Sequence, residues 1–408
     1  MKLFQKLLLA PAALGLFAPV VANANESNFR DVTNYTQDQV EVSIDTFNPL
    51  SSKNPLLAGG EGASSSQSSN DFDVDSFSAT TIAQFTSNIA LATIDGESNA
   101  GANLDQELAL DYDWSVNLST SFTGSDSLDV VIQGGEAGRF PELDLTDAGS
   151  TDSRLQVDTV TYTNAVSDRV TAFFASGNGT SGSNLYNTAC IYGGVADTFG
   201  DCGVSSANID EGLGTAAGLN FDFENGLTFA LGYEGQGMTS GEVGLMSVNG
   251  ADAIGAQVAY YGDSFGVSLS FANIDNHNDN NSNARASTGQ TQSTGLNAFY
   301  QPDLVNFPSI SVGFETKHDN SVTGTITDDS SHYFIGLQWD EVGDGSLGAA
   351  IGSEAPTVEN TDAQTMYELF YSYNYADGIT LTPFYYSKDN TGTIESETGF
   401  GVKTEFSF

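Results

Sequence analysis

Basic residues are scarce in this sequence. Its 408 residues include 11 Lys and Arg against 53 Asp and Glu, which gives a formal net charge of −42. A chain with so few cations cannot neutralise a row of phosphates, which argues against nucleic-acid binding. Glu–Lys pairs that would support helices are also missing, and the 44 Gly residues would be costly inside helices, so a helical bundle is disfavoured.

Residues for catalysis and metal binding are equally sparse. With two Cys and three His, the sequence has no spacing typical of a metal centre, and it contains no phosphate loop or dinucleotide fingerprint. Residues 262–266 match the G-x-S-x-G motif of hydrolases, but an alternating strand follows where that motif needs a helix. We therefore interpret them as a tight turn and expect no enzyme activity and no cofactor. Acidic loops such as residues 273–283, around His277, could bind Ca²⁺ weakly.

The N-terminus has the organisation of a secretory signal peptide. Two Lys residues precede an apolar run over residues 7–21, and small residues at 22–24 provide a cleavage site. Residues 1–24 are therefore predicted to direct export. Beyond them, no stretch approaches the roughly 18 continuous apolar residues of a membrane-spanning helix. Residues 25–75 form a short segment that ends in a Ser- and Gly-rich linker.

From residue 76 onward, hydrophobic residues recur at every second position. Between Leu104 and Leu118 the even positions are almost all apolar, whereas the odd positions carry acidic, polar or small side chains. Only an extended strand places alternate residues on opposite faces. The pattern predicts an all-β protein of about 16 strands, near residues 76–94, 104–122, 127–134, 154–164, 168–176, 212–223, 227–235, 252–261, 265–273, 292–301, 308–317, 331–340, 345–353, 365–375, 379–388 and 397–408.

The connections between these predicted strands alternate in length. Short ones such as residues 224–226 contrast with long polar ones such as residues 177–211 and 274–291. Short periplasmic turns and long outer loops describe a transmembrane antiparallel up-and-down β-barrel over residues 76–408, surrounded by outer-membrane lipid. A soluble β-sandwich would alternate as well. The rarity of Lys and Arg on the apolar face, and the Tyr and Trp residues near strand ends, favour the barrel.

Three short stretches resemble one family. The first eleven residues (MKLFQKLLLAP) resemble the leader of cyanobacterial outer-membrane porins, residues 77–81 (FSATT) resemble their first strand, and residues 118–128 (LSTSFTGSDSL) resemble their most recognisable turn. On these stretches, and on its layout from about residue 75 to the end, the chain is similar to the carbohydrate-selective porin (OprB-like) family. The resemblance implies a diffusion channel of about 16 strands that is often a homotrimer.

Residues 25–75 depart from that family. Its cyanobacterial members usually carry an S-layer homology domain after the leader, and residues 29–32 (FRDV) echo the start of one. The rest of the segment is too short and too Ser-rich, so it is at most a remnant and gives no support for a contact with peptidoglycan. The family name does not decide the cargo either, because basic residues are so few, and sugars and inorganic ions remain alternatives.

If the apolar strand faces contact lipid, the opposite faces line the channel. The predicted pore-lining residues are mostly acidic: Asp105, Glu107, Asp111, Asp113, Asp129, Glu315, Lys317, Glu368, Lys403 and Glu405. Such carboxylates would attract cations by direct Coulomb interaction, and they would also keep the lumen hydrated. The sequence therefore predicts a preference for cations.

The only two cysteines, Cys190 and Cys202, lie together in the long loop over residues 177–211, and in an exported protein they are expected to form a disulfide. In general porins the third outer loop folds into the barrel, and by analogy this loop is a candidate constriction. The acids in or beside it are Asp197, Asp201, Asp210 and Glu211. An exposed loop stiffened by the disulfide is the alternative.

These observations together predict an outer-membrane porin that lets small hydrophilic solutes and ions diffuse passively. One alternative is a secreted or surface acidic β-protein that binds Ca²⁺ or mediates adhesion. A hydrolase that uses Ser264 is a second alternative.

Overall fold

The strands of the protein follow the predicted pattern closely. The computed structural model describes residues 81–97, 106–143, 145, 154–177, 179–237, 244–246, 250–275, 290–304, 306–319, 329–354, 364–390 and 395–408. The predicted signal peptide, residues 25–75, Asp105 and most of the acidic loop around His277 lie outside these residues. The 16 strands are β1 (Thr81–Asp95), β2 (Gln106–Thr120), β3 (Asp126–Glu136), β4 (Gln156–Ser167), β5 (Val170–Gly177), β6 (Thr215–Asp222), β7 (Leu227–Gly235), β8 (Asp252–Tyr261), β9 (Phe265–Asp275), β10 (Gln290–Tyr300), β11 (Ser309–Asp319), β12 (Asp329–Val342), β13 (Gly345–Glu354), β14 (Gln364–Ala376), β15 (Ile379–Lys388) and β16 (Glu397–Ser407).

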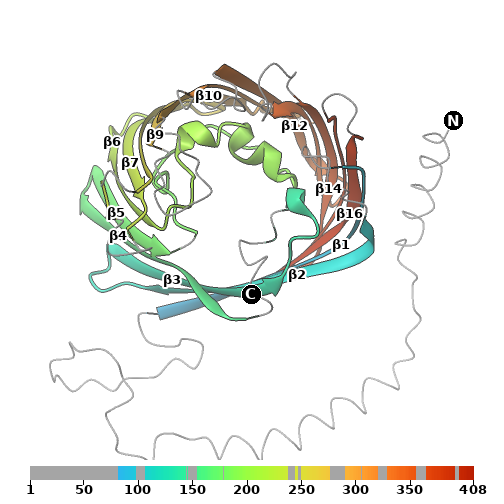
Figure 1. The fold of residues 1–408 in the computed structure, drawn as a ribbon, viewed down its shortest axis with the longest axis horizontal. Coiled ribbons are helices and arrows are strands. Elements are labelled where there is room, and N and C mark those ends of the chain that lie inside the picture. Colours follow the sequence, from blue (N-terminus) through green and yellow to red (C-terminus); the bar gives the residue numbers. More distant parts are fainter. Residues whose placement is uncertain are drawn as a thin grey trace, which may run out of the picture. The chain divides into compact units, whose positions relative to one another are not determined.

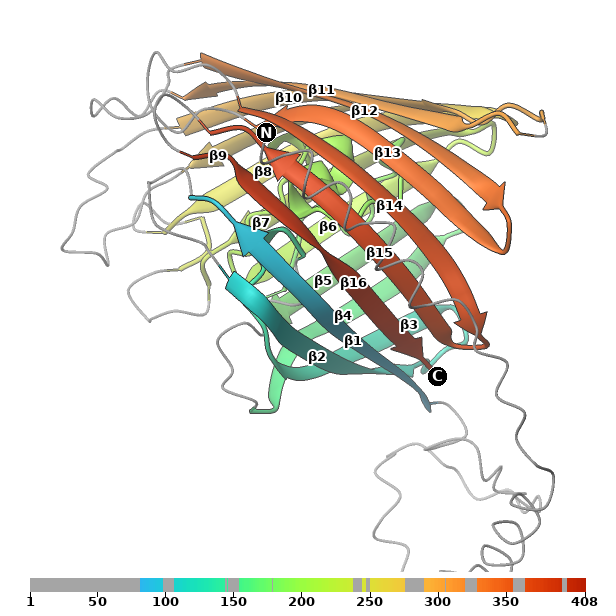
Figure 2. The ribbon, with the colours of Figure 1, turned by 90° about the vertical axis from the view of Figure 1, so that its right-hand side faces the viewer.

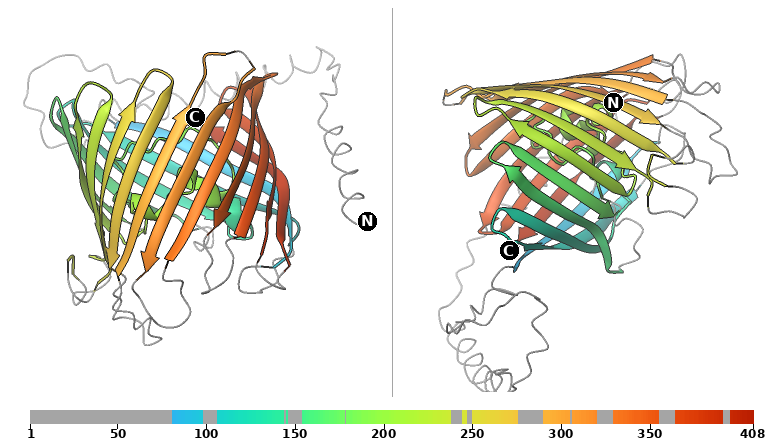
Figure 3. Two further views of the ribbon diagram at one scale, coloured as in Figure 1. Left: turned by 90° about the horizontal axis from the view of Figure 1, so that it is seen from above. Right: turned by 90° about the vertical axis from the view of Figure 1, so that its left-hand side faces the viewer.

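The strands form one closed antiparallel barrel (Figure 1). Each strand pairs with its neighbours in sequence, and β1 closes the barrel by pairing with β16. At the end of this seam Phe85 and Phe408 exchange two backbone hydrogen bonds of 2.8 and 3.0 Å, and their rings stack at 5.4 Å. Figures 2 and 3 show the strands tilted, as closure of a sheet requires. The predicted fold class is confirmed, and the β-sandwich alternative is wrong because the sheet closes on itself.

The outer surface of the barrel is apolar. Outward-pointing side chains such as Leu110, Ile254, Phe314 and Phe400 are about half exposed to solvent. On β2 the even positions point outward, whereas Asp111 and Asp113 between them are buried inside the barrel. The predicted alternation is therefore confirmed, and it leaves an exposed apolar band far larger than soluble monomers carry.

Short and long connections alternate as predicted. Residues 168–169, 343–344 and 377–378 form tight turns at one end, whereas the connections at the other end are mostly much longer. The G-x-S-x-G stretch is the predicted turn: Gly262 N–H donates to the Phe265 carbonyl at 2.8 Å, and β9 follows directly. No helix among the described residues is long and apolar enough to cross a membrane.

Candidate functional site

The connection between β5 and β6 lies inside the barrel, where Figure 1 shows its short helical turns in the lumen. We call its described residues 179–214 the inner loop. After a turn at residues 182–185, residues 187–195 run along the barrel wall from β8 to β14. Every second backbone N–H donates to an inward side chain of the wall: Asn187 to Gln257 (2.6 Å), Ala189 to Ser268 (2.9 Å), Ile191 to Ser311 (3.2 Å), Gly193 to Gln338 (2.9 Å) and Val195 to Glu368 (2.5 Å). Alternate N–H groups of an extended chain point the same way, so an arc of wall side chains can bind this segment without a partner strand.

The second half of the inner loop returns along the same wall, through the 3-10 turns η5 (Asp197–Cys202) and η6 (Ser206–Asn208). Ala207 N–H donates to Glu315 at 2.6 Å, and Glu211 and Leu213 N–H donate to Glu234 at 3.1 and 2.9 Å. On β9, Ser270 donates to Asn208 of the second half, whereas Ser268 accepts from Ala189 of the first half. Ser270 lies two residues nearer than Ser268 to the barrel end that carries the long connections. The inner loop is therefore a band of two chain segments lying flat on the wall.

A disulfide joins these two segments. Cys190 lies on the first segment, in the first half of the inner loop, and Cys202 lies on the return segment, in the second half. Their Cα atoms are 5.8 Å apart. The predicted pairing is confirmed. It prevents either segment from leaving the wall without the other.

Glycines of the wall provide room for the return segment. A Cβ atom on Gly295 would lie 1.9 Å from Val204 Cγ1, and one on Gly313 would lie 1.9 Å from the carbonyl oxygen of Cys202. Sequence reasoning missed these positions, although an inward-facing Gly in an alternating strand often marks the close approach of another backbone.

We expect Gly313→Ala to loosen the return segment while leaving the barrel folded. The added methyl group collides with the backbone of Cys202, and such overpacking costs about 1–3 kcal/mol. Limited proteolysis within the inner loop should accelerate. The matched control is Gly200→Ala, because nothing lies within 4 Å of a Cβ there and the φ of −50° suits alanine. Equal protection in both variants would contradict the prediction.

Four of the predicted pore-lining carboxylates face inward but do not contact water. Asp111 is 0% exposed, Glu315 1%, Asp113 2% and Glu368 4%. The expectation that they meet channel water is wrong, because the connections folded inside the barrel cover three of them and Asn88 of the neighbouring strand hydrogen-bonds the fourth, Asp113. Their oxygens accept hydrogen bonds instead.

The other predicted residues lie closer to the lumen water. Glu107 and Glu405 are exposed, whereas Asp129, Lys317 and Lys403 are half-buried. On the inner loop Asp197, Asp210 and Glu211 are exposed and Asp201 is half-buried, accepting a hydrogen bond from Asn208 Nδ2 at 3.0 Å. The inner loop contains no basic residue, so the surface it turns to the water is purely acidic in charge.

Buried carboxylates hold the inner loop by accepting hydrogen bonds from its backbone N–H groups. Glu234, Glu315 and Glu368 do so from the wall, and Glu142 does so for Thr198. Such charge-assisted hydrogen bonds are stronger than neutral ones. Sequence reasoning missed Glu142 and Glu234, since an acid on an inward position does not reveal whether it meets water or a backbone.

Two groups on the inner loop have shifted pKa values. Burial, followed by the nearby Glu368 carboxylate, raises the pKa of Tyr192, which keeps its hydroxyl protonated as the donor to Glu368 Oε2 at 2.9 Å. Although part of the Glu211 side chain reaches solvent, the protein atoms around it desolvate the carboxylate and raise its pKa, with Lys317 opposing and Asp210 adding to the shift. Glu211 therefore loses its charge at a higher pH than a free glutamate.

Half of the basic residues that the structure describes form ion pairs with acids. Among the described residues six are Lys or Arg, of which Arg139, Arg169 and Lys388 pair with Asp111, Glu224 and Glu142. Lys317 donates to Ser206 Oγ at 3.4 Å. Lys317 and Lys403 are therefore the basic residues that the described strands turn toward the lumen outside these ion pairs.

Solved porins share this architecture. No protein-family model and no curated protein sequence matches the chain. Pseudomonas putida OprB, in its high-pH structure, is 10% identical over 81% of this chain and 94% of that chain, with a TM-score of 0.55. An anion-selective porin from Comamonas acidovorans is 13% identical over 81% and 99%, with a TM-score of 0.55. A mutant of the Rh. blastica porin is 14% identical over 80% and 100%, with a TM-score of 0.51. The chain therefore has the fold of a 16-stranded porin, and membership in one porin family stays a prediction.

Proposed function

We propose that this protein is an outer-membrane porin, a passive diffusion channel for small hydrophilic solutes and ions that prefers cations. A closed barrel with an apolar outer face supports the membrane location, because lipid would cover that face. The proposed partners are outer-membrane lipid and, following the sequence resemblance, further copies of the chain in a homotrimer. Transport by diffusion involves no covalent step, and we propose neither a cofactor nor an enzymatic activity.

The charge on the water-facing side of the inner loop carries the proposed cation preference. Asp197, Asp210 and Glu211 are exposed there without a basic residue in the loop. Carboxylates beside the narrowest part of a channel lower the energy of a passing cation and raise that of an anion. One similar structure is named as an anion-selective porin, so this fold serves either preference and the side chains decide it.

Reversal potentials in a planar bilayer under a salt gradient test this proposal. We expect cation preference for the wild type and a weaker preference for the double variant Asp210→Asn, Glu211→Gln. The matched control removes two acids from exposed short turns, Asp263→Asn with Asp377→Asn, and should retain the preference of the wild type. Anion preference in the wild type would contradict the selectivity, and absence of conductance would contradict the channel.

A further inference from the structure

A second connection also turns into the barrel. Residues 137–143 and 145, after β3, are called here the second loop, and they contain the 3-10 turn η3 (Pro141–Leu143). Phe140 and Leu143 are 3% and 2% exposed and belong to one buried apolar cluster with Ile94 of β1 and Tyr386 of β15. Because β2, β1 and β16 lie between β3 and β15, the second loop reaches inward across these three strands. Figure 1 shows it in the lumen beside the inner loop.

The second loop is held at both of its ends. At its start, the Arg139 backbone N–H donates to Asp111 Oδ2 at 2.9 Å, and the guanidinium group contacts the other oxygen of that carboxylate. At its far side, Glu142 Oε1 accepts from Lys388 Nζ of β15 at 2.9 Å. Glu142 and Lys388 are 5% and 7% exposed, so this ion pair is nearly closed to water.

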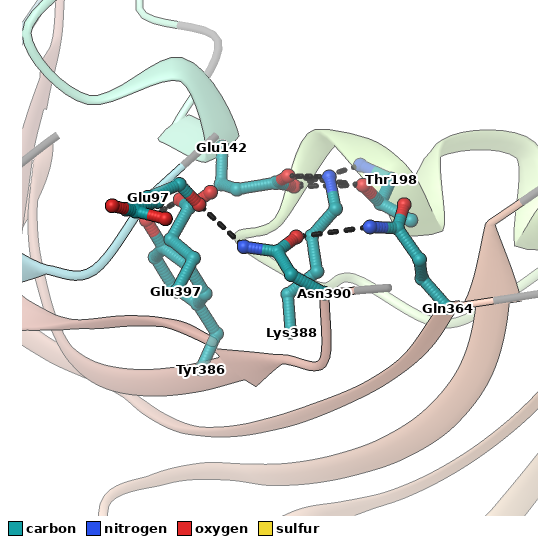
Figure 4. Close-up of polar contacts among 8 residues, drawn as sticks. All are labelled: Glu97, Glu142, Thr198, Gln364, Tyr386, Lys388, Asn390 and Glu397. Atoms are coloured by element: carbon teal, nitrogen blue, oxygen red, sulfur yellow. Dashed lines mark hydrogen bonds and ion pairs between the residues drawn. The ribbon is translucent and has the colours of Figure 1, made fainter. Parts of the chain in front are cut away.

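The same Glu142 carboxylate also binds the inner loop. Thr198 donates its backbone N–H at 3.2 Å and its hydroxyl at 2.9 Å, as Figure 4 shows. Glu142 therefore joins the second loop, the inner loop and the wall strand β15 at one point. Phe199, which follows Thr198, belongs to the same buried apolar cluster as Phe140 and Leu143.

The strand ends around this point are braced by further hydrogen bonds. Tyr386 donates its hydroxyl to Glu397 at 2.8 Å, joining β15 to β16. Gln364 donates to Asn390 at 2.9 Å, and Asn390 in turn donates to the carbonyl of Glu97 beyond β1 (Figure 4). Lys388 is thus presented to Glu142 by a rigid frame of β14, β15, β16 and β1.

We propose that Lys388 is the positioning residue that holds the second loop in the lumen through Glu142 and thereby limits the width of this channel. The inner loop covers the wall from β7 to β14, and the second loop covers it across β15, β16 and β1. The open lumen is therefore displaced toward the wall of β3 to β5, beyond the contact of the second loop with Asp111 of β2. This inference rests on the proposed channel function.

Lys388→Met tests the proposal, because methionine keeps an unbranched apolar side chain but leaves Glu142 without its cation. In liposome-swelling assays with neutral sugars of increasing size, the variant should admit larger sugars than the wild type, and its single-channel conductance should rise. Lys403→Met is the matched control. It removes one inward lysine from the adjacent strand β16 that is not a member of the Glu142 ion pair, so it should alter ion selectivity without shifting the size limit.

A folded Lys388→Met variant with an unchanged size limit would overturn the proposal. Folding is read from the different gel mobility of unheated and boiled samples. If Lys388→Met does not fold, Glu142→Gln decides, because glutamine keeps an acceptor for Thr198 and loses only the ion pair.

Trypsin separates failure of this inference from failure of the proposed function. Cleavage after Arg139 should be faster in Lys388→Met than in the wild type, whether or not the protein conducts. If the wild type forms no channel but Lys388→Met is still cleaved faster than the wild type, the proposed function is overturned and the attachment of the second loop still stands. Equal cleavage rates would overturn the attachment itself.

Discussion

Replacing Glu368 with alanine should detach the middle of the inner loop from the barrel wall. This carboxylate accepts hydrogen bonds from the Tyr192 hydroxyl and from the backbone N–H groups of Val195 and Ala196. Each buried donor left without an acceptor costs about 1–3 kcal/mol. Because three donors lose their acceptor at once, we expect this segment to loosen from the wall and the channel to widen, with higher single-channel conductance and rapid proteolysis within the inner loop.

Two further variants show whether the hydrogen bonds or the charge of Glu368 matter. Glu368→Gln keeps a carbonyl acceptor for the two backbone donors, and its conductance should stay near that of the wild type. Glu405→Ala removes an exposed inward carboxylate from β16 and should change ion selectivity without releasing the inner loop. If Glu368→Ala conducts and resists protease like the wild type, the inner loop does not depend on this carboxylate.

Removal of the disulfide is the second change with a large expected effect. The Cys190→Ser, Cys202→Ser variant frees a loop that the bridge closes over a sequence separation of 12. Closing a loop of this length contributes about 3 kcal/mol. We expect the return segment to leave the wall while the first segment stays bound. The return segment makes its own contacts with the wall, around η5 and η6, and without the disulfide these are not linked to those of the first segment.

Single-channel recordings should show detachment of the return segment as additional current noise. They should also show substates above a base conductance close to that of the wild type. A reducing agent should produce the same behaviour in the wild type and no further change in the double variant, which controls for effects of the agent on the barrel. Quiet recordings from the double variant would show that the hydrogen bonds to the wall hold both segments without the bridge.

The strands were predictable because each one repeats a local rule many times. On β2 the alternation of Leu108 and Leu110 with Asp111 and Asp113 assigns the two faces, and the structure has Leu outward and Asp inward. A period of two needs no knowledge of distant residues. The disulfide was predictable for a related reason, since the sequence offers only one possible pair.

The role of each inward carboxylate was not predictable in this way. Asp113 and Glu405 both lie on the inward side and both pair across the sheet with Asn88, yet one is 2% exposed and the other is open to the lumen. Glu142 and Lys388, which form the buried ion pair, are 246 residues apart in the chain. No local pattern relates two such positions.

By itself, the sequence determined the number of strands, their faces and the excess of acid, because each of these is a sum of short-range features. Only the tertiary structure decided which acids are exposed and which hold a loop, since that depends on where the inner loop and the second loop lie against distant strands. The wall glycines and the Glu142–Lys388 pair act only when the barrel closes and brings them to one place. Among the described residues, the inward acids therefore fall into two groups: exposed carboxylates, to which we attribute the proposed cation preference, and buried carboxylates that accept hydrogen bonds from the loops inside the barrel.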